Sequence, residues 1–251
     1  MSSSQTHSFF AKLAPNYDEL RNTGEFWPEL VERVAREADL KGRRVLDVGS
    51  GTGRWAAALA ERYGCKVWGI DASPEMVELA RTRVPAGVGL RVARSEQLPF
   101  KDAWFERVLM SLVLHLGDRP KTLAEAYRVL EPGGVLAVVT FDYAHFERYL
   151  LGPYFPSFEA RDKERFPDAR ALEQELLDAG FESARLLRLS QREQVTRESL
   201  LARIRGRHIS TFQLIDDDEY RAGLERAERE LPETAVNTLE WLIAVAVRGT
   251  G

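Results

Sequence analysis

The stretch VLDVGSGTG, residues 45–53, constrains the fold of this chain more than any other segment. It begins with a short apolar run of the kind found in buried strands, and three glycines then alternate at Gly49, Gly51 and Gly53. A helical pattern opens at Arg54. A glycine-rich turn between a strand and a helix can wind tightly and bring backbone N–H groups close to a ligand. We therefore expect a buried strand that leads into a nucleoside-cofactor loop.

Predicted strands and helices alternate through the first half of the chain. Strands are predicted at residues 43–48, 66–70, 89–93, 105–112 and 135–141. Helices are predicted at residues 26–40, 54–63, 73–83 and 120–130. Alternation at this spacing is typical of βαβ units, so we expect a parallel sheet covered by helices.

The second half departs from this alternation. Residues 143–166 are rich in aromatic side chains, Arg and Pro, and predict an inserted helical cap. Further helices are predicted at 168–179, 197–205 and 217–231, and strands at 183–189 and 238–247. No repeat, linker or low-complexity segment divides the sequence. We therefore expect one domain, residues 1–251, with a partial cap in its second half.

Composition and charge exclude several classes of protein. The 251 residues carry 35 Lys and Arg against 39 Asp and Glu, so a broad attraction to nucleic acid or anionic lipid is not expected. The single Cys65 cannot form an internal disulfide, which is typical of a reducing compartment. Residues 1–13 lack a signal-peptide core, and the apolar run at 241–247 is far too short to cross a bilayer. We expect a cytoplasmic protein without a membrane segment.

The glycine pattern differs from that of a dinucleotide fold. A dinucleotide fingerprint is G-x-G-x-x-G, whereas here Arg54 stands at the position of the third glycine. Asp47, just before the loop, would repel a pyrophosphate but could accept a hydrogen bond from an amine. The pattern favours a ligand with an amino-acid tail over a nicotinamide cofactor.

Asp71 lies at the end of the next predicted strand, 20 residues after Gly51. A carboxylate there can accept two hydrogen bonds from a ribose diol. Taken alone, it could equally be a turn or N-cap residue before Ser73 and Pro74. Its spacing from the glycine loop favours the ribose interpretation.

Four segments together resemble the class I S-adenosylmethionine-dependent methyltransferases: VLDVGSGTG, WGIDASPEMVELA, SEQLPF and HLGDRPKTLAEAYRVLEPGGVLAVV. The similarity is to the type 11-like small-molecule group with a Leu-Pro-Phe motif, and it covers residues 9–142 well and the remainder in outline. It implies an α/β fold with a Rossmann-like, doubly wound, mostly parallel seven-stranded sheet, an antiparallel last strand and a small helical cap. It also implies S-adenosyl-L-methionine as cofactor and S-adenosyl-L-homocysteine as product.

The resemblance assigns roles on the methionine side of the cofactor. The loop residues Gly49, Ser50, Gly51 and Gly53 would line the methionine moiety. Asp47 would lie near the ammonium group, directly or through water. Ser111 and Leu112 would face the methionine from the end of the fourth strand. Tyr17 would close over the cofactor, so residues 1–40 are expected to form lid helices.

Other positions in the expected cofactor-binding half, residues 41–142, would bind the nucleoside side of the cofactor. Asp71 would hold the ribose hydroxyls, and Ala72 and Met76 would flank the adenine. Ser95, Glu96 and Gln97 would meet the adenine edge. Family members often carry an acid at the position of Arg94. Recognition of the adenine amine would then fall to Glu96 or to backbone carbonyls.

The sequence constrains the identity of the methyl acceptor less than that of the cofactor. A general base is needed only if the acceptor must lose a proton, and His115 is the candidate catalytic residue, with His145 second. A histidine held by a local hydrogen bond is the alternative for His115. Residues 111–114, Ser-Leu-Val-Leu, lack the Asn/Asp-Pro-Pro-aromatic motif of amino-methylating nucleic-acid enzymes. Cys65 is badly placed for carbon-5 pyrimidine chemistry.

A small-molecule acceptor, bound in the substrate-side half at residues 143–251, is therefore expected, with no metal. Aromatic residues could cover a planar or apolar acceptor: Tyr143, His145, Phe146, Tyr149, Tyr154, Phe155 and Phe158. Arg148, Arg161 or Arg165 could pair with a carboxylate. Arg203, Arg205, Arg207 and His208 form a basic cluster that could bind phosphate or simply be a solvated helix end. A methyltransferase acting on RNA or protein, or a non-catalytic cofactor-binding protein, remains an alternative, and the sequence leaves the oligomeric state open.

Overall fold

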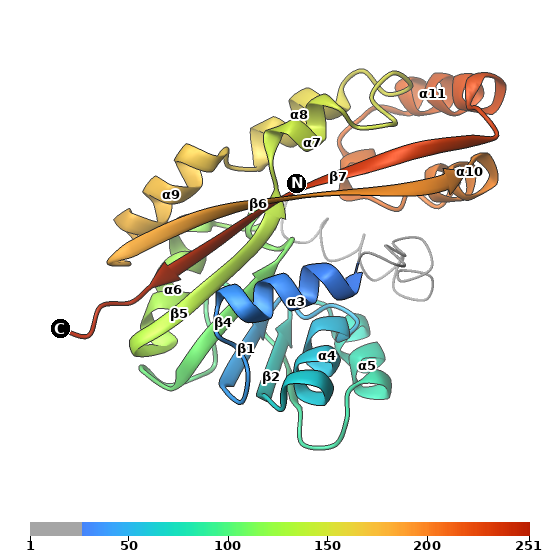
Figure 1. Ribbon diagram of the computed structural model, residues 1–251. Helices are drawn as coiled ribbons and strands as arrows, with labels where there is room; N and C mark the ends of the chain where they lie inside the picture. The colour runs from blue at the N-terminus through green and yellow to red at the C-terminus, as the bar shows by residue number, and fades with distance from the viewer. Residues whose placement is uncertain (1–26) are drawn as a thin grey trace.

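A computed structural model describes residues 27–251, which build one mixed, seven-stranded sheet in the order β3-β2-β1-β4-β5-β7-β6 (Figure 1). The strands are β1 (Arg44–Val48), β2 (Lys66–Asp71), β3 (Gly89–Val92), β4 (Phe105–Ser111), β5 (Leu130–Phe141), β6 (Ser183–Thr196) and β7 (Thr234–Val247). Neighbours from β3 to β5 pair in parallel, and β7 is antiparallel to both β5 and β6. The expected Rossmann-like sheet with an antiparallel last strand is confirmed.

Helices pack on both faces of the sheet because successive strand residues point to opposite sides. α3 (Trp27–Glu37) and α4 (Arg54–Tyr63) bury Leu30, Val34 and Leu59 on one face. α6 (Arg119–Val129) and α9 (Ala169–Asp178) bury Leu123 and Leu172 on the other. α5 (Pro74–Arg83) begins with Ser73 as its N-cap, whose hydroxyl accepts from the Met76 amide. The predicted elements of this half are present: β5 begins five residues before its predicted start at Val135, and the other ends shift by at most three residues.

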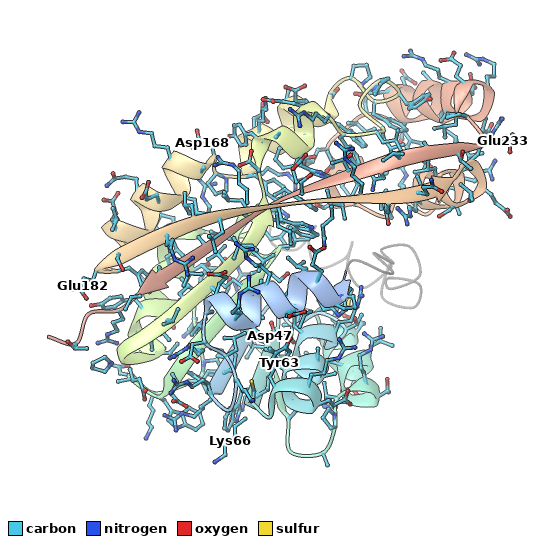
Figure 2. The ribbon with its side chains drawn as sticks, viewed as in Figure 1. Asp47, Tyr63, Lys66, Asp168, Glu182 and Glu233 are labelled. Atoms are coloured by element: carbon cyan, nitrogen blue, oxygen red, sulfur yellow. The ribbon has the colours of Figure 1, made fainter. Side chains whose placement is uncertain are left out.

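The last two strands are longer than predicted. β6 runs seven residues past the expected end at Leu189, and the pair is continuous to Thr196 opposite Thr234. Figure 2 labels Glu182 and Glu233 at the two ends of this pair. The extension is polar in sequence, yet Gln191, Glu193 and Val195 alternate inward and are buried. Side-chain hydrogen bonds compensate the two polar residues: Gln191 bonds to Glu29 and Trp241, and Glu193 accepts from Arg203 and Asn237.

The extended strand pair carries most of the cap. The cap comprises α7 (Tyr143–Glu147), α8 (Phe158–Arg165), α10 (Arg197–Arg205), the short 3₁₀ helix η4 (Ser210–Gln213) and α11 (Asp217–Glu230). All of these elements except α7 share a core of their own that includes Phe155, Phe158, Ile204 and Phe212. The cap therefore uses both the 143–166 segment and the residues between β6 and β7. Within residues 27–251, no helix is long and apolar enough to span a membrane.

Candidate active site

The glycine loop joins β1 to α4 in a left-handed conformation. Gly49, Gly51 and Gly53 have φ values of 72°, 52° and 78°, which other residues rarely adopt. The amides of Gly49 and Ser50 both donate to the Ile70 carbonyl at 2.8 Å. These bonds fix the loop against the carboxyl end of β2, where ligands of open α/β sheets bind.

The three glycines have different surroundings. A Cβ atom at Gly49 would lie 2.5 Å from the Val113 side chain, and one at Gly53 would lie 3.0 Å from Ala80 on α5. A Cβ at Gly51 would meet nothing within 4 Å. Gly51 therefore borders open space, whereas Gly49 and Gly53 permit close packing. Gly53 lies outside the cleft described next, so its contact with a cofactor stays a prediction.

A cleft of about 120 Å³ lies beside the loop at the carboxyl ends of β1, β2 and β4. It brings together these predicted cofactor residues: Gly49, Gly51, Asp71, Ala72, Met76, Ser95, Glu96, Ser111 and Leu112. Ser50 borders an adjoining cavity instead, and Asp47 and Gln97 border neither space. Gln97 is exposed and bridges to Arg94. Tyr17 lies outside the described residues.

Asp71 connects the loop to the start of α5. Its carboxylate accepts from the Gly51 amide at 2.9 Å and from the Ser73 amide at 2.8 Å. It is partly exposed in the cleft, and Ser73, rather than Asp71, caps the helix. The turn role and a ligand-facing role are therefore compatible at this residue.

Glu96 is held as an anion at the other end of the cleft. Burial alone would raise its pKa, but amide hydrogen bonds from Glu96 itself and Asp118 and the Arg94 guanidinium outweigh burial and lower the pKa. Arg94 lies 3.1 Å from Glu96. Glu96 is thus a negatively charged hydrogen-bond acceptor near the position where the family pattern would place an acid.

Asp47 on β1 is a buried carboxylate with a raised pKa. Its side chain is 1% exposed, and among residues 27–251 neither oxygen has a hydrogen-bond partner of normal geometry. Burial raises its pKa to about 7, the nearby Asp71 charge adds to the rise, and the Ala56 amide offsets a small part. Such an uncompensated carboxylate beside the loop suits a cationic ligand.

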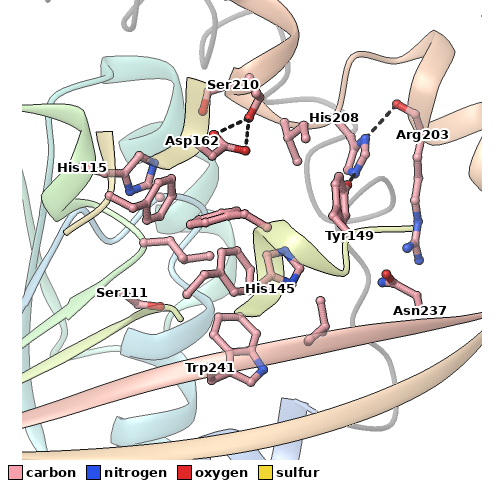
Figure 3. Close-up of a pocket in the computed structure, with 18 of the residues that line it drawn as sticks. Ser111, His115, His145, Tyr149, Asp162, Arg203, His208, Ser210, Asn237 and Trp241 are labelled. Carbon is pink, nitrogen blue, oxygen red and sulfur yellow. Dashed lines mark hydrogen bonds between the residues drawn. The ribbon is translucent and has the colours of Figure 1, made fainter. Parts of the chain in front are cut away.

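A second cavity, of about 210 Å³, adjoins the cleft and shares Gly49, Gly51, Ser111 and Leu112 with it. Seven aromatic side chains line it: Trp27, Trp55, Phe141, Phe146, Tyr149, Phe166 and Trp241. Figure 3 labels Tyr149 and Trp241 among the residues that line the cavity. Leu112, at the junction, has a left-handed backbone with φ 51°, which is uncommon for its residue type. The arrangement offers a largely apolar chamber, lined in part by flat aromatic rings, that adjoins the cofactor cleft.

Both candidate histidines line this cavity. His115 stacks on Phe166 with ring centroids 3.8 Å apart. His145 is 5% exposed, stacks on Phe141, and its Nδ1 lies 3.3 Å from the Thr238 carbonyl. Burial lowers the pKa of His145 to about 4, despite the opposing effect of that carbonyl, so it is neutral near pH 7.

The predicted aromatic and arginine groups divide between cavity and surface. Phe146, Tyr149 and Arg165 line the cavity, as do His145 and Phe166. The other aromatic residues proposed for the lid, Tyr143, Tyr154, Phe155 and Phe158, do not line it; the last two fill the cap core. Arg148 and Arg161 are exposed and pair with Glu240 and Glu164.

The predicted basic cluster does not exist as a unit. Arg203 is largely buried with Glu193, and its Nη1 lies 3.0 Å from Oε1 of that residue, while His208 is also buried beside the cavity. Arg205 and Arg207 point elsewhere and pair with Glu228 and Asp217. The four residues do not converge on one site, because Arg203 lies on the inner face of α10 whereas Arg205 is exposed at its end.

Several cavity residues were missed by sequence reasoning. Trp27, Trp55, Asn237 and Trp241 come from elements far apart in the chain, and no local motif connects them. The tryptophans lie on helices or strands whose apolar faces were predicted, but the periodicity did not show what they would face. Within the described chain, no cluster of His, Cys, Asp and Glu could hold a metal ion.

Comparisons with known proteins identify the family of this chain. Residues 45–134 match a family model described as a methyltransferase domain. The chain is 32% identical over 211 residues to demethylmenaquinone methyltransferase of Chlorobaculum tepidum, across 73% of this chain and 86% of that protein. It is also 32% identical over 203 residues to the ubiquinone/menaquinone biosynthesis C-methyltransferase of Neisseria meningitidis serogroup B, across 69% of this chain and 82% of that protein.

The fold has solved counterparts. A proposed antibiotic-pathway methyltransferase from Anabaena variabilis superimposes with a TM-score of 0.71, across 86% of this chain and 96% of that chain. The two sequences are 21% identical, so this likeness concerns the fold alone.

Proposed function

Because the chain belongs to the class I S-adenosylmethionine-dependent methyltransferases, we propose that it methylates a small, planar and largely apolar acceptor. It is an enzyme that takes the methyl group from S-adenosylmethionine. The acceptor and the arrangement of the cofactor on this chain's residues are our proposal. The observation that carries it is the aromatic cavity that shares Gly49, Gly51, Ser111 and Leu112 with the cofactor cleft.

The residues around the cleft suit the methyl donor. Asp71 would hold the ribose hydroxyls while it keeps its bonds to the Gly51 and Ser73 amides. Glu96 would accept from the adenine amine. The uncompensated Asp47 carboxylate would favour a nearby ammonium group, directly or through water. When bound, the donor supplies a methyl group on a positively charged sulfur for in-line displacement.

The aromatic cavity would align the acceptor. Its stacked rings, Phe141 with Trp241 and His115 with Phe166, present flat faces suited to a conjugated ring. Correct alignment of acceptor and methyl group can supply about 7–11 kcal/mol of the barrier reduction. The relatives named for quinone biosynthesis support an aromatic acceptor, and methylation at carbon is the chemistry that one of their names states.

Incubation with methyl-labelled S-adenosylmethionine and separate metabolite, RNA and protein fractions tests this proposal. We expect the label to enter an aromatic metabolite, identified by mass spectrometry, and to disappear with the Asp71→Ala variant. Label found only in RNA or protein would contradict the small-molecule acceptor. Binding of S-adenosylhomocysteine without transfer to any fraction would identify a non-catalytic cofactor-binding protein.

A further inference from the structure

Tyr149 and His208 meet at one end of the aromatic cavity. Tyr149 lies just after α7, and His208 follows α10, so the cap brings them together from segments 59 residues apart. The Tyr149 hydroxyl lies 3.5 Å from Nε2 of His208, and both residues line the cavity. Figure 3 shows them on the side of the cavity opposite Ser111 and His115. The pair therefore lies away from the glycine loop.

The backbone selects the tautomer of His208. Nδ1 lies 3.0 Å from the Arg203 carbonyl oxygen, which can only accept a hydrogen bond. Nδ1 must therefore carry the proton, and the neutral ring presents the lone pair of Nε2 toward Tyr149. The tyrosine hydroxyl then donates to Nε2, and the same oxygen can also act as a hydrogen-bond acceptor toward the cavity that Tyr149 lines. The 3.5 Å separation lies at the long end of the hydrogen-bond range.

The surroundings of the pair are polar but internally balanced. Arg203 pairs with Glu193, and Arg165 pairs with Asp162, so both of these cavity arginines have an anionic partner. Asn237 donates to Glu193 at 2.8 Å, and its buried Oδ1 has no hydrogen-bond partner among the described residues. This end of the cavity therefore suits a neutral hydroxyl group better than a carboxylate, which would need an unpaired cation.

We propose that Tyr149 and His208 are a proton-accepting catalytic pair for an acceptor that carries a phenolic hydroxyl, conjugated with the ring carbon that receives the methyl group. This inference rests on the proposed methyltransferase function and names the acceptor class: phenols and hydroquinones. The hydroxyl passes its proton to the Tyr149 oxygen as Tyr149 passes its own to Nε2 of His208. The resulting phenolate makes its ortho and para carbons nucleophilic.

The step balances in atoms and charge. The ring carbon–methyl bond forms as the sulfur–methyl bond breaks, so the sulfonium charge is lost while His208 holds one proton as imidazolium. The methylated ring then loses its C–H proton to water and regains aromaticity. The oxygen takes back the proton held by His208, and one proton is released overall.

A spectroscopic titration tests the pair without methyl transfer. 4-Nitrophenol is added to the protein, with and without S-adenosylhomocysteine, and the pKa of the bound phenol is read from its visible phenolate band. An apolar cavity alone would raise that pKa, whereas a proton-accepting pair lowers it. We expect a lowered pKa in the natural protein and in the control Tyr154→Phe, a cap tyrosine outside the cavity. His208→Gln should abolish the lowering.

Kinetics with 1,4-dihydroxynaphthalene as acceptor give a second readout. Tyr149→Phe and His208→Gln should lower kcat about 10²–10⁴-fold, with unchanged affinity for S-adenosylhomocysteine. Failure of 4-nitrophenol to bind, or a pKa that is raised in the natural protein, would overturn the inference. If the enzyme methylates amines but no phenol, the inference fails while the proposed function stands. Absence of both S-adenosylhomocysteine binding and methyl transfer would instead refute the proposed function.

Discussion

Replacing Asp47 by Asn should remove an electrostatic cost that grows with pH. Burial raises the pKa of Asp47 from its ordinary 3.8 to about 7 in the folded protein. Between these values the folded chain keeps a proton that the unfolded chain has lost, so the stability of the natural protein falls as pH rises through this window. Below this pH window Asp47 is protonated in both states and does not affect stability. Above the window its ionised form destabilises the folded protein by the full amount.

The magnitude follows from the two pKa values. Each pKa unit corresponds to about 1.36 kcal/mol, so the rise from 3.8 to about 7 costs about 4 kcal/mol once Asp47 is ionised. Asn cannot ionise and has nearly the same shape. The variant should therefore gain stability relative to the natural protein by about 1.4 kcal/mol per pH unit within the window, and by a constant amount above it.

Urea denaturation of both proteins from about pH 5 to about pH 8, without ligand, measures this difference. A stability difference that does not change with pH would refute the assignment of the raised pKa to Asp47. S-adenosylhomocysteine provides a further check, because an ammonium group near Asp47 would stabilise the ionised form. The ligand should therefore stabilise the natural protein more than Asp47→Asn at the alkaline end, and equal stabilisation would contradict the proposed position of the ammonium group.

Three further substitutions test other parts of the site. Asp71→Ala should weaken S-adenosylhomocysteine binding in calorimetry by about 1.5–3 kcal/mol, because hydrogen bonds to a charged group are lost; unchanged affinity would exclude the ribose contact. Gly42→Ala places a side chain in open space at φ 73° and should lower the free energy of unfolding by about 1 kcal/mol. Gly53→Ala, at φ 78°, should lower it more, because its Cβ would also contact α5. Equal losses of stability in thermal unfolding would argue against a packing role for Gly53. Asp162→Ala removes the buried ion-pair partner of Arg165 and should lower the free energy of unfolding by about 3 kcal/mol in denaturation. A loss under about 1 kcal/mol would mean that the ion pair is solvated.

Features that depend on neighbours in the chain were predictable from the sequence. The glycine loop, Asp71 and the start of α5 at Ser73 all belong to one βαβ unit, in which a parallel sheet brings the strand ends to one edge. Short-range capping and strand order then place Gly51 beside Asp71 with little freedom. Asp142 follows the same local logic, because it directly precedes α7 and its carboxylate accepts from the Ala144 amide.

The acceptor cavity depended on tertiary structure. Its walls combine Trp27, Trp55 and Trp241, which come from the two ends of the described chain. The polar residues 190–196 gave no strand signal, yet pairing with β7 extends β6 and positions the cap. His208 belongs to a run of basic residues but is buried, because the turn after α10 directs it toward Tyr149. Hydrophobic periodicity identifies which face of an element is buried, but not which distant residues it meets. The sequence by itself therefore determined the methyl-donor loop, whereas only packing between remote elements decided what surrounds the acceptor.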